Sequence, residues 1–356
     1  MKTPRVNIKL KNIEENANNM VEKCDKKGIK LTGVVKGSAG DLKVASAFIR
    51  GGVKSIGDSR IKNIKKLREA GFEEEMVLLR LPQLSEVEEV VEDVDITLIS
   101  ELKTIKALNN KAKSKGKKQG IIVMVDVGDL REGVLPDDLE EFFAQIVDLE
   151  AIDIKGIGTN VGCYGGVLPS KENTKILVDL KEKLEKEFNI KLPLISGGNT
   201  ATSKLIDNDQ LPEGITNFRI GEGILQGTDI THQRKIKGQN QDNFTLSAKI
   251  IELKEKPSVP KGKIGHDAFG NKPQFEDKGI RLRAILAIGR QDVKVDGLTP
   301  MLEKAEIIGA SSDHLLVDLT EINRNFQVGD ELEFSLDYGA MLAVMTSEYV
   351  YKTYEQ

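Results

Sequence analysis

The sequence Leu31-Thr-Gly-Val-Val-Lys36, followed by Gly37-Ser38-Ala39-Gly40, is a short apolar run that ends in a lysine and opens into small residues. A buried strand of this kind places the lysine amine at the mouth of a barrel or sheet, where an aldehyde cofactor could reach it. Most lysines that end strands only reach solvent, so this segment alone favours a structural role for Lys36. Residues further along the chain reverse that interpretation.

Apolar runs alternate with amphipathic stretches over the first two-thirds of the 356 residues, which is the pattern of repeated strand-helix units. Continuous apolar runs are typical of parallel strands that are covered on both faces. Eight units therefore predict a TIM-type (β/α)8 barrel. The predicted strands are 31–36, 53–57, 76–81, 96–99, 120–127, 154–159, 192–196 and 217–220, and the clearest helices between them are 60–70, 101–113, 137–149 and 170–187.

After about Arg234 the helical period gives way to short β-like segments separated by turns, which predicts a β-rich C-terminal domain. These segments are 244–253, 281–289, 306–310, 315–319 and 331–335. Residues 5–10 also alternate like a strand, and we expect them to pair with that domain. The predicted division is therefore a barrel over 11–234 and a β-rich domain made of 1–10 and 235–356.

The composition limits the possible partners of the chain. Its 52 Lys and Arg residues are mixed with 56 Asp and Glu, for a net charge of −4, so no basic stripe is present to bind nucleic acid. No segment resembles a signal peptide or a membrane span, which favours a cytoplasmic protein without a membrane partner. Cys24 and Cys163 are far apart and lack metal-ligand spacing, so we predict neither a disulfide framework nor a metal site.

Chemically suggestive residues follow several predicted strands, at the barrel end where reactive groups gather. Small residues after the seventh and eighth strands would let backbone N–H groups approach a phosphate, to which the Thr200 hydroxyl adds a donor. Any one of these glycine-rich turns is a weak signal, and their shared position gives them weight. The segments are Asp126-Val-Gly-Asp129-Leu-Arg131-Glu-Gly133, Thr159-Asn160-Val-Gly-Cys163-Tyr-Gly-Gly166, Ser196-Gly-Gly-Asn199-Thr200 and Phe218-Arg219-Ile-Gly221-Glu222-Gly223.

These segments resemble the fold-type III pyridoxal phosphate (PLP) enzymes, the alanine racemase superfamily. Val34-Val35-Lys36 is similar to the family's Schiff-base strand, Val125–Val134 to its fifth-strand arginine segment, and Phe218–Gly221 to its ring-nitrogen arginine segment. The resemblance spans nearly the whole chain. Gly128–Gly133, Gly162–Gly166, Ser196–Ser203 and His266–Asn271 look more like the ornithine racemase branch than like alanine racemase itself.

The resemblance implies a role for each matching residue. Lys36 would hold PLP as an internal aldimine and then act as the base at Cα, and Arg219 would face the pyridine nitrogen, where a guanidinium only donates hydrogen bonds. Arg131 would lie by the cofactor phenolate and the substrate carboxylate, although an ion pair with Asp129 or Glu132 competes with that role. The further cofactor-binding candidates are Asn160, Asn199, Thr200, Gly221, Glu222 and, in place of a family tyrosine that is Gly40 here, Tyr349.

Racemisation also requires a second acid/base, because a proton leaves one face of Cα and another arrives at the opposite face. The family's second base is a tyrosine from the partner subunit, but this chain has Gly289-Arg290-Gln291-Asp292 in that segment, and arginine cannot serve. Cys163 and His266 are the titratable candidates. A buried structural role for Cys163 and a loop hydrogen bond for His266 are the competing interpretations.

A diamino-acid substrate would need a carboxylate for its terminal ammonium group, because an unpaired charge in a closed site is costly. The candidates for this substrate contact, besides Arg131 for the substrate carboxylate, are Asp129, Asp267, Asp292 and Asp313. Together with these carboxylates, the resemblance implies an amino-acid racemase that acts on ornithine or another basic amino acid. The resemblance also implies a head-to-tail homodimer.

Several alternatives stay open at this point. They are an alanine or broad-specificity racemase, a PLP-dependent aldolase or decarboxylase of the same fold, and a PLP-homeostasis protein. The last kind of relative is a single barrel, so the β-rich segment argues against it. A racemase that uses two thiols and no cofactor is disfavoured, since Cys24 precedes the first barrel strand.

Overall fold

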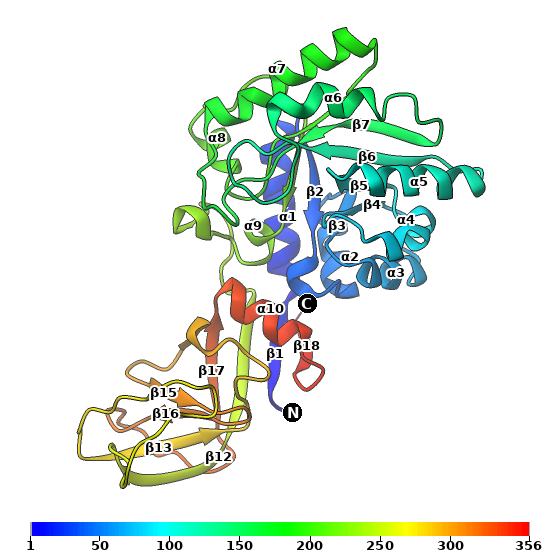
Figure 1. The fold of residues 1–356 in the computed structure, drawn as a ribbon. Helices are drawn as coiled ribbons and strands as arrows, with labels where there is room; N and C mark the ends of the chain where they lie inside the picture. Colours follow the sequence, from blue (N-terminus) through cyan, green and yellow to red (C-terminus); the bar gives the residue numbers. More distant parts are fainter. Residues whose placement is uncertain (1, 356) are drawn as a thin grey trace. The chain divides into compact units, whose positions relative to one another are not determined.

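The computed structural model describes residues 2–355, which form two compact units (Figure 1). One unit holds Leu10–Gln241, and the other holds the chain up to Lys9 together with the chain from Asp242 onward. Each unit has its own sheet.

The larger unit is a closed barrel of eight parallel strands, as the sequence predicts. The first strand, β2, pairs with both β3 and the last strand, β9, which closes the barrel. The strands are β2 (Lys30–Val34), β3 (Ser55–Asp58), β4 (Glu75–Leu78), β5 (Ile96–Ile99), β6 (Gln119–Met124), β7 (Ile152–Gly158), β8 (Leu194–Ser196) and β9 (Asn217–Ile220).

Helices cover the outside of the barrel (Figure 1), so its strands are buried on both faces. Every residue of β5 and β6 is buried, which explains their uninterrupted apolar sequences. An Asp41 cap on the backbone N–H groups of Lys43 and Val44 starts α2. The helices are α1 (Leu10–Asp25), α2 (Leu42–Arg50), α3 (Ile61–Glu69), α4 (Val87–Asp93), α5 (Leu102–Ser114), α6 (Leu139–Ala144), α7 (Lys171–Phe188), α8 (Ser203–Asp207) and α9 (Glu222–Leu225).

The first strand ends two residues earlier than the sequence predicts. β2 stops at Val34, and Lys36 opens the 3-10 turn η1 (Lys36–Ser38). The Ser38 hydroxyl and backbone N–H both donate to the Val35 carbonyl, and Ala39 adopts a left-handed conformation with φ of 53°. These local bonds turn the chain immediately after Val35. The predicted helix over 137–149 is likewise shorter, because α6 ends at Ala144.

The smaller unit is an antiparallel sheet in the order β14-β17-β12-β13-β16-β15. The N-terminal strand β1 (Arg5–Lys9) joins it antiparallel to β12 and parallel to β18, so the expected pairing of residues 5–10 with this part of the chain is confirmed. The remaining elements are β12 (Phe244–Pro257), β13 (Ile280–Leu286), β14 (Leu298–Pro300), β15 (Glu306–Ala310), β16 (Leu315–Asp318), β17 (Glu331–Leu336), β18 (Tyr351–Glu355) and the helix α10 (Tyr338–Thr346).

Over residues 2–355, no helix is both long and apolar enough to cross a membrane.

Candidate active site

The C-terminal ends of the barrel strands bring most of the predicted site residues to one end of the larger unit. Lys36 follows β2, Arg131 lies in the loop after β6, and Asn160 follows β7. Thr200 follows β8, while Arg219 lies within β9. In a parallel barrel these positions share one rim, which is where such folds carry their chemistry.

The Lys36 side chain is accessible to solvent, yet protein surrounds its amine on most sides. Burial lowers the Lys36 pKa below its usual value. The charges that act on the amine oppose one another: Cys163 and Asp58 raise its pKa, and Arg131 and Arg219 lower it. An accessible amine with a depressed pKa is a better nucleophile and base near neutral pH than an ordinary lysine.

Arg219 is held rigidly inside the barrel, with only 5% of its surface exposed. One terminal nitrogen, Nη1, donates to the Ser196 hydroxyl, and the other, Nη2, donates to the Thr159 carbonyl over 2.6 Å. Burial is the main reason why its pKa falls to about 10. It therefore remains a cation at neutral pH, fixed between the ends of β7 and β8.

Arg131 is paired with its neighbour, Glu132. Two guanidinium nitrogens, Nε and Nη2, donate to the two carboxylate oxygens of Glu132, and this pairing raises the Arg131 pKa. Asp129 instead is almost fully buried and accepts the backbone N–H groups of Tyr164 at 3.0 Å and Val167 at 3.3 Å. Of the two partners considered for Arg131, the one in hydrogen-bond contact is Glu132. The Asp129 carboxylate ties the loop after β6 to the loop after β7.

Cys163 is an exposed thiol that faces two amide donors. The Asn160 side-chain nitrogen lies 2.9 Å from its sulfur, and the Asn199 side-chain nitrogen lies 3.7 Å from it. Asn199 also donates to the Val161 carbonyl at 2.7 Å, which fixes its position. The competing interpretation of Cys163 as a buried apolar residue is wrong, because its side chain is exposed.

The turn after β9 approaches the backbone of β2 closely. A Cβ atom at Gly221 would lie 2.9 Å from the Val34 carbonyl, so only glycine fits there without displacement. The Thr200 hydroxyl accepts the Gly223 backbone N–H at 3.2 Å. These contacts place a hydroxyl beside the glycine-rich turn, as the sequence predicts for a phosphate-binding segment.

The short hairpin of β10 (Thr228–Asp229) and β11 (Arg234–Lys235) supports that turn. The Glu222 carboxylate accepts the Thr228 hydroxyl and the Ile230 backbone N–H, both at 2.8 Å. Burial raises the Glu222 pKa to about 7.

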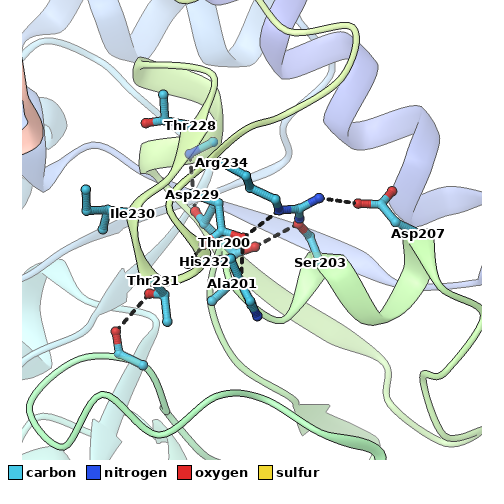
Figure 2. A network of polar contacts seen from close by, with 12 residues as sticks. Thr200, Ala201, Ser203, Asp207, Thr228, Asp229, Ile230, Thr231, His232 and Arg234 are labelled. Atoms are coloured by element: carbon cyan, nitrogen blue, oxygen red, sulfur yellow. Dashed lines mark hydrogen bonds and ion pairs between the residues drawn. The ribbon is translucent and has the colours of Figure 1, made fainter.

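Figure 2 shows Arg234 between two carboxylates, those of Asp229 and Asp207 in α8, each 2.9 Å away. His232 also contacts Asp229, at 2.8 Å. This network holds the hairpin against the helix that follows Thr200.

Five of the predicted site residues belong to the β-rich unit. His266 and Tyr349 are exposed there, and Asp267 accepts the backbone N–H groups of its own turn. The Asp292 carboxylate accepts the Ser347 hydroxyl at 2.7 Å, and the Asp313 carboxylate accepts the Ser312 hydroxyl at 2.6 Å. A catalytic or substrate-binding role for any of these residues stays a prediction.

Sequence reasoning gave no site role of their own to two acidic residues at the barrel end. Asp58 is the last residue of β3 and is completely buried, and burial raises its pKa to about 6. Glu132 was considered only as a competing partner for Arg131, although its charge also acts on Arg219. In the sequence, Asp58 could have been noticed as the carboxylate that ends the short strand Ser55-Ile-Gly-Asp58, at the same rim as Lys36.

Comparisons with known proteins agree with this fold. The family described as alanine racemase, N-terminal domain, matches residues 8–227. The chain is 48% identical to an ornithine racemase of Acetoanaerobium sticklandii, over 98% of this chain and 99% of that protein. It is 44% identical to a lysine racemase of Thermotoga maritima, over 99% and 98%. A solved alanine racemase from Clostridium difficile has the same fold, with a TM-score of 0.78 and 22% identity over 100% of this chain and 96% of that one.

Proposed function

The chain belongs to the alanine racemase family, and on that basis we propose that it is a PLP-dependent racemase that interconverts the L and D forms of a basic amino acid. Ornithine is the first candidate substrate and lysine the second, in line with the two relatives that align over almost their whole length. The observation that carries the proposal is the accessible Lys36 amine, which shares one barrel end with two arginines and a thiol.

The residues at this end suit PLP. Lys36 offers an amine for the aldehyde, and Thr200 with the backbone N–H groups of Gly221 and Glu222 would hold the phosphate. The tight approach of Gly221 to Val34 leaves no room for a side chain beside that phosphate segment. When bound, PLP supplies an electron sink that makes the Cα–H of an attached amino acid acidic.

The two arginines would orient the cofactor and the substrate. Arg219 donates hydrogen bonds and cannot accept them, so a ring nitrogen that faces it would stay unprotonated. That arrangement would keep the electron sink modest and would favour return of the proton to Cα. Arg131, oriented by Glu132, would bind the substrate carboxylate through its guanidinium fork. Asn160 and Asn199 would border the same ring.

Two proton carriers would serve the two faces of Cα. Lys36 Nζ takes or returns the proton on one face, and Cys163 Sγ does so on the other. Electrostatic coupling of Lys36 to Cys163 supports this pairing. His266, in the β-rich unit, is the second candidate for the role that we assign to Cys163.

We further propose that the protein acts as a head-to-tail homodimer, as the family resemblance implies, and that it works in the cytoplasm. A reducing compartment would keep both Cys24 and Cys163 as free thiols.

The proposed contacts for the terminal ammonium of the substrate are the carboxylates of Asp129, Asp267, Asp292 and Asp313. Tyr349 is proposed as a phosphate contact.

The test is a circular-dichroism assay with single enantiomers. Purified protein loaded with PLP is mixed with L-ornithine, L-lysine or L-alanine, and the decay of optical activity is followed alongside mass spectrometry of the products. We expect decay for ornithine or lysine with no change in mass, and loss of that decay in Lys36→Ala but not in the exposed control Lys62→Ala. Loss of CO2 or cleavage of the side chain would instead indicate a decarboxylase or an aldolase. PLP binding without any turnover would indicate a homeostasis protein.

A further inference from the structure

Asp58 is a buried carboxylate whose position relative to Lys36 is fixed by backbone pairing. The Val35 backbone N–H donates to the Gly57 carbonyl at 2.9 Å, so β2 and β3 are joined at the residues just before Lys36 and Asp58. The next strand holds Asp58 from its other side, since the Leu79 N–H donates to the Asp58 carbonyl at 2.8 Å. The register of Val34 with Gly57 therefore places Asp58 beside Val35, the residue that directly precedes Lys36.

The start of α3 clamps the Asp58 side chain. One carboxylate oxygen accepts the Arg60 backbone N–H at 2.9 Å, and the Asn63 amide donates to both oxygens at 3.1 Å. Asn63 also packs against the loop that follows Lys36, because a Cβ at Gly40 would lie 2.7 Å from the Asn63 Cβ. One asparagine thus anchors the carboxylate and borders the lysine loop.

Four charged or titratable groups act on the Lys36 amine, one from each of four elements. They are Asp58 at the end of β3, Arg131 in the loop after β6, Cys163 in the loop after β7 and Arg219 in β9. Cys163 and Arg131 are exposed, whereas Asp58 and Arg219 are buried and held by hydrogen bonds. Asp58 is therefore the fixed negative charge that opposes the fixed positive charge of Arg219.

We propose that Asp58 is a positioning residue for Lys36, which sets from β3 the pH at which the lysine amine becomes free to take a proton. The proposal rests on the proposed function only in one respect, namely that racemisation would use the Lys36 amine as a base. It concerns Lys36 itself, and its test does not require turnover.

The direction of the effect follows from charge. An anion near an ammonium group favours the charged form, so Asp58 holds the Lys36 pKa higher than burial alone would leave it. Asp58 carries this charge above its own pKa of about 6. Above that pH, neutralising the side chain removes an attraction and makes the Lys36 amine free at lower pH.

The experiment measures the reactivity of Lys36 in the protein without PLP. The chain is acetylated briefly at a series of pH values, and peptide mass spectrometry gives the extent of modification at Lys36. In Asp58→Asn we expect the midpoint of modification to move to lower pH, with a rate at neutral pH that rises about tenfold for each unit of the shift. The matched control is Asp95→Asn. Asp95 lies just before β5, at the opposite end of the barrel, and its carboxylate accepts the Met76 N–H. This substitution should leave the Lys36 midpoint unchanged.

Asn63→Ala provides a second variant in case Asp58→Asn does not fold. It keeps the carboxylate but removes two of its hydrogen bonds, which shifts Asp58 toward its neutral form and should move the Lys36 midpoint in the same direction. An unchanged or higher midpoint in a folded variant overturns the proposal. Because the readout is chemical modification of the protein without cofactor, it separates failure of this inference from failure of the racemase assignment, which the circular-dichroism assay tests.

Discussion

Asn160 donates a hydrogen bond from its side-chain amide to the sulfur of Cys163 across 2.9 Å. This contact distinguishes the exposed thiol from the buried Cys24, whose pKa burial raises to about 12. An exposed thiol held by an N–H donor therefore lies at the rim that carries Lys36.

Cys163→Ala should lose most of the racemase activity but keep the proton exchange on the face of Cα that Lys36 serves. If Cys163 serves one face of Cα, we expect the rate to fall by about 10²-fold or more. The Lys36 side of the reaction should survive, so one enantiomer should still exchange its Cα–H with D2O, which NMR detects without any assay of chirality. Racemisation at the wild-type rate would exclude Cys163 and move attention to His266.

Asn160→Ala should slow the alkylation of Cys163 by iodoacetamide. The Asn160 amide holds the sulfur in one orientation at the rim, and its removal leaves the thiol without that contact. The measurement is the rate of label incorporation at Cys163 at fixed pH. Asn173→Ala is a control, because the Asn173 side chain belongs to the capping box that starts α7 and bonds Ser170 and Leu168 instead of the thiol. Equal alkylation rates in the wild type and Asn160→Ala would contradict the role given to Asn160.

Glu132→Gln should lower the catalytic efficiency, kcat/KM, of the protein. Without the carboxylate, Arg131 loses a charged partner that fixes both Nε and Nη2. Because a misplacement of about 1 Å can cost about 10²-fold in rate, we expect kcat/KM to fall by a factor between about 10 and 10². The neighbouring Asp126→Asn serves for comparison, since Asp126 accepts backbone N–H groups of its own turn. Steady-state kinetics on both variants makes the test, and unaltered kcat/KM in Glu132→Gln would show that Arg131 needs no such support.

Arg219→Ala should destabilise the barrel as well as impair the reaction. The Ser196 hydroxyl and the Thr159 carbonyl would lose their donor inside a buried site, which costs about 1 to 3 kcal/mol of unfolding free energy. Urea unfolding of the protein without PLP measures this cost. A stability equal to the wild type would mean that solvent or a neighbouring group replaces the guanidinium.

Glu222 predicts a pH dependence of stability. Its folded pKa of about 7 lies above the ordinary value of 4.5, so the fold favours its neutral form. This contribution is complete below about pH 4.5, is lost as the pH rises through 7, and amounts to at most about 3 kcal/mol. When the pH rises from about 5 to about 8, the wild type should therefore lose this stability and Glu222→Gln should not, so the difference in stability should shift in favour of the variant. Thermal unfolding at both pH values tests the sign, and an equal difference at the two would refute it.

The barrel was predictable because parallel strands buried on both faces leave unbroken apolar runs, as in β5 and β6. The short elements were harder to foresee. α9 has four residues and α10 lies within a β-rich segment, so neither gives a long periodic signal. Lys36 was expected to close a strand, but local bonds to the Val35 carbonyl turned the chain first.

For the candidate site, chain position predicted which residues share the barrel end but not which ones touch. Spacing could place Asn160 and Cys163 on one loop, yet only the structure shows the amide aimed at the sulfur. Asp58 gave a weak signal, because a carboxylate at a strand end is usually solvated. Its burial is a tertiary effect of α3 folding over it.

The lysine that binds PLP can be located by chemical trapping. Holoprotein is reduced with borohydride, digested and mapped by mass spectrometry. We expect a pyridoxyl-phosphate label on Lys36, absent when Lys36→Ala is treated in the same way. A label on another lysine, or no label on a folded protein saturated with PLP, would contradict the role of Lys36 on which the proposed function depends.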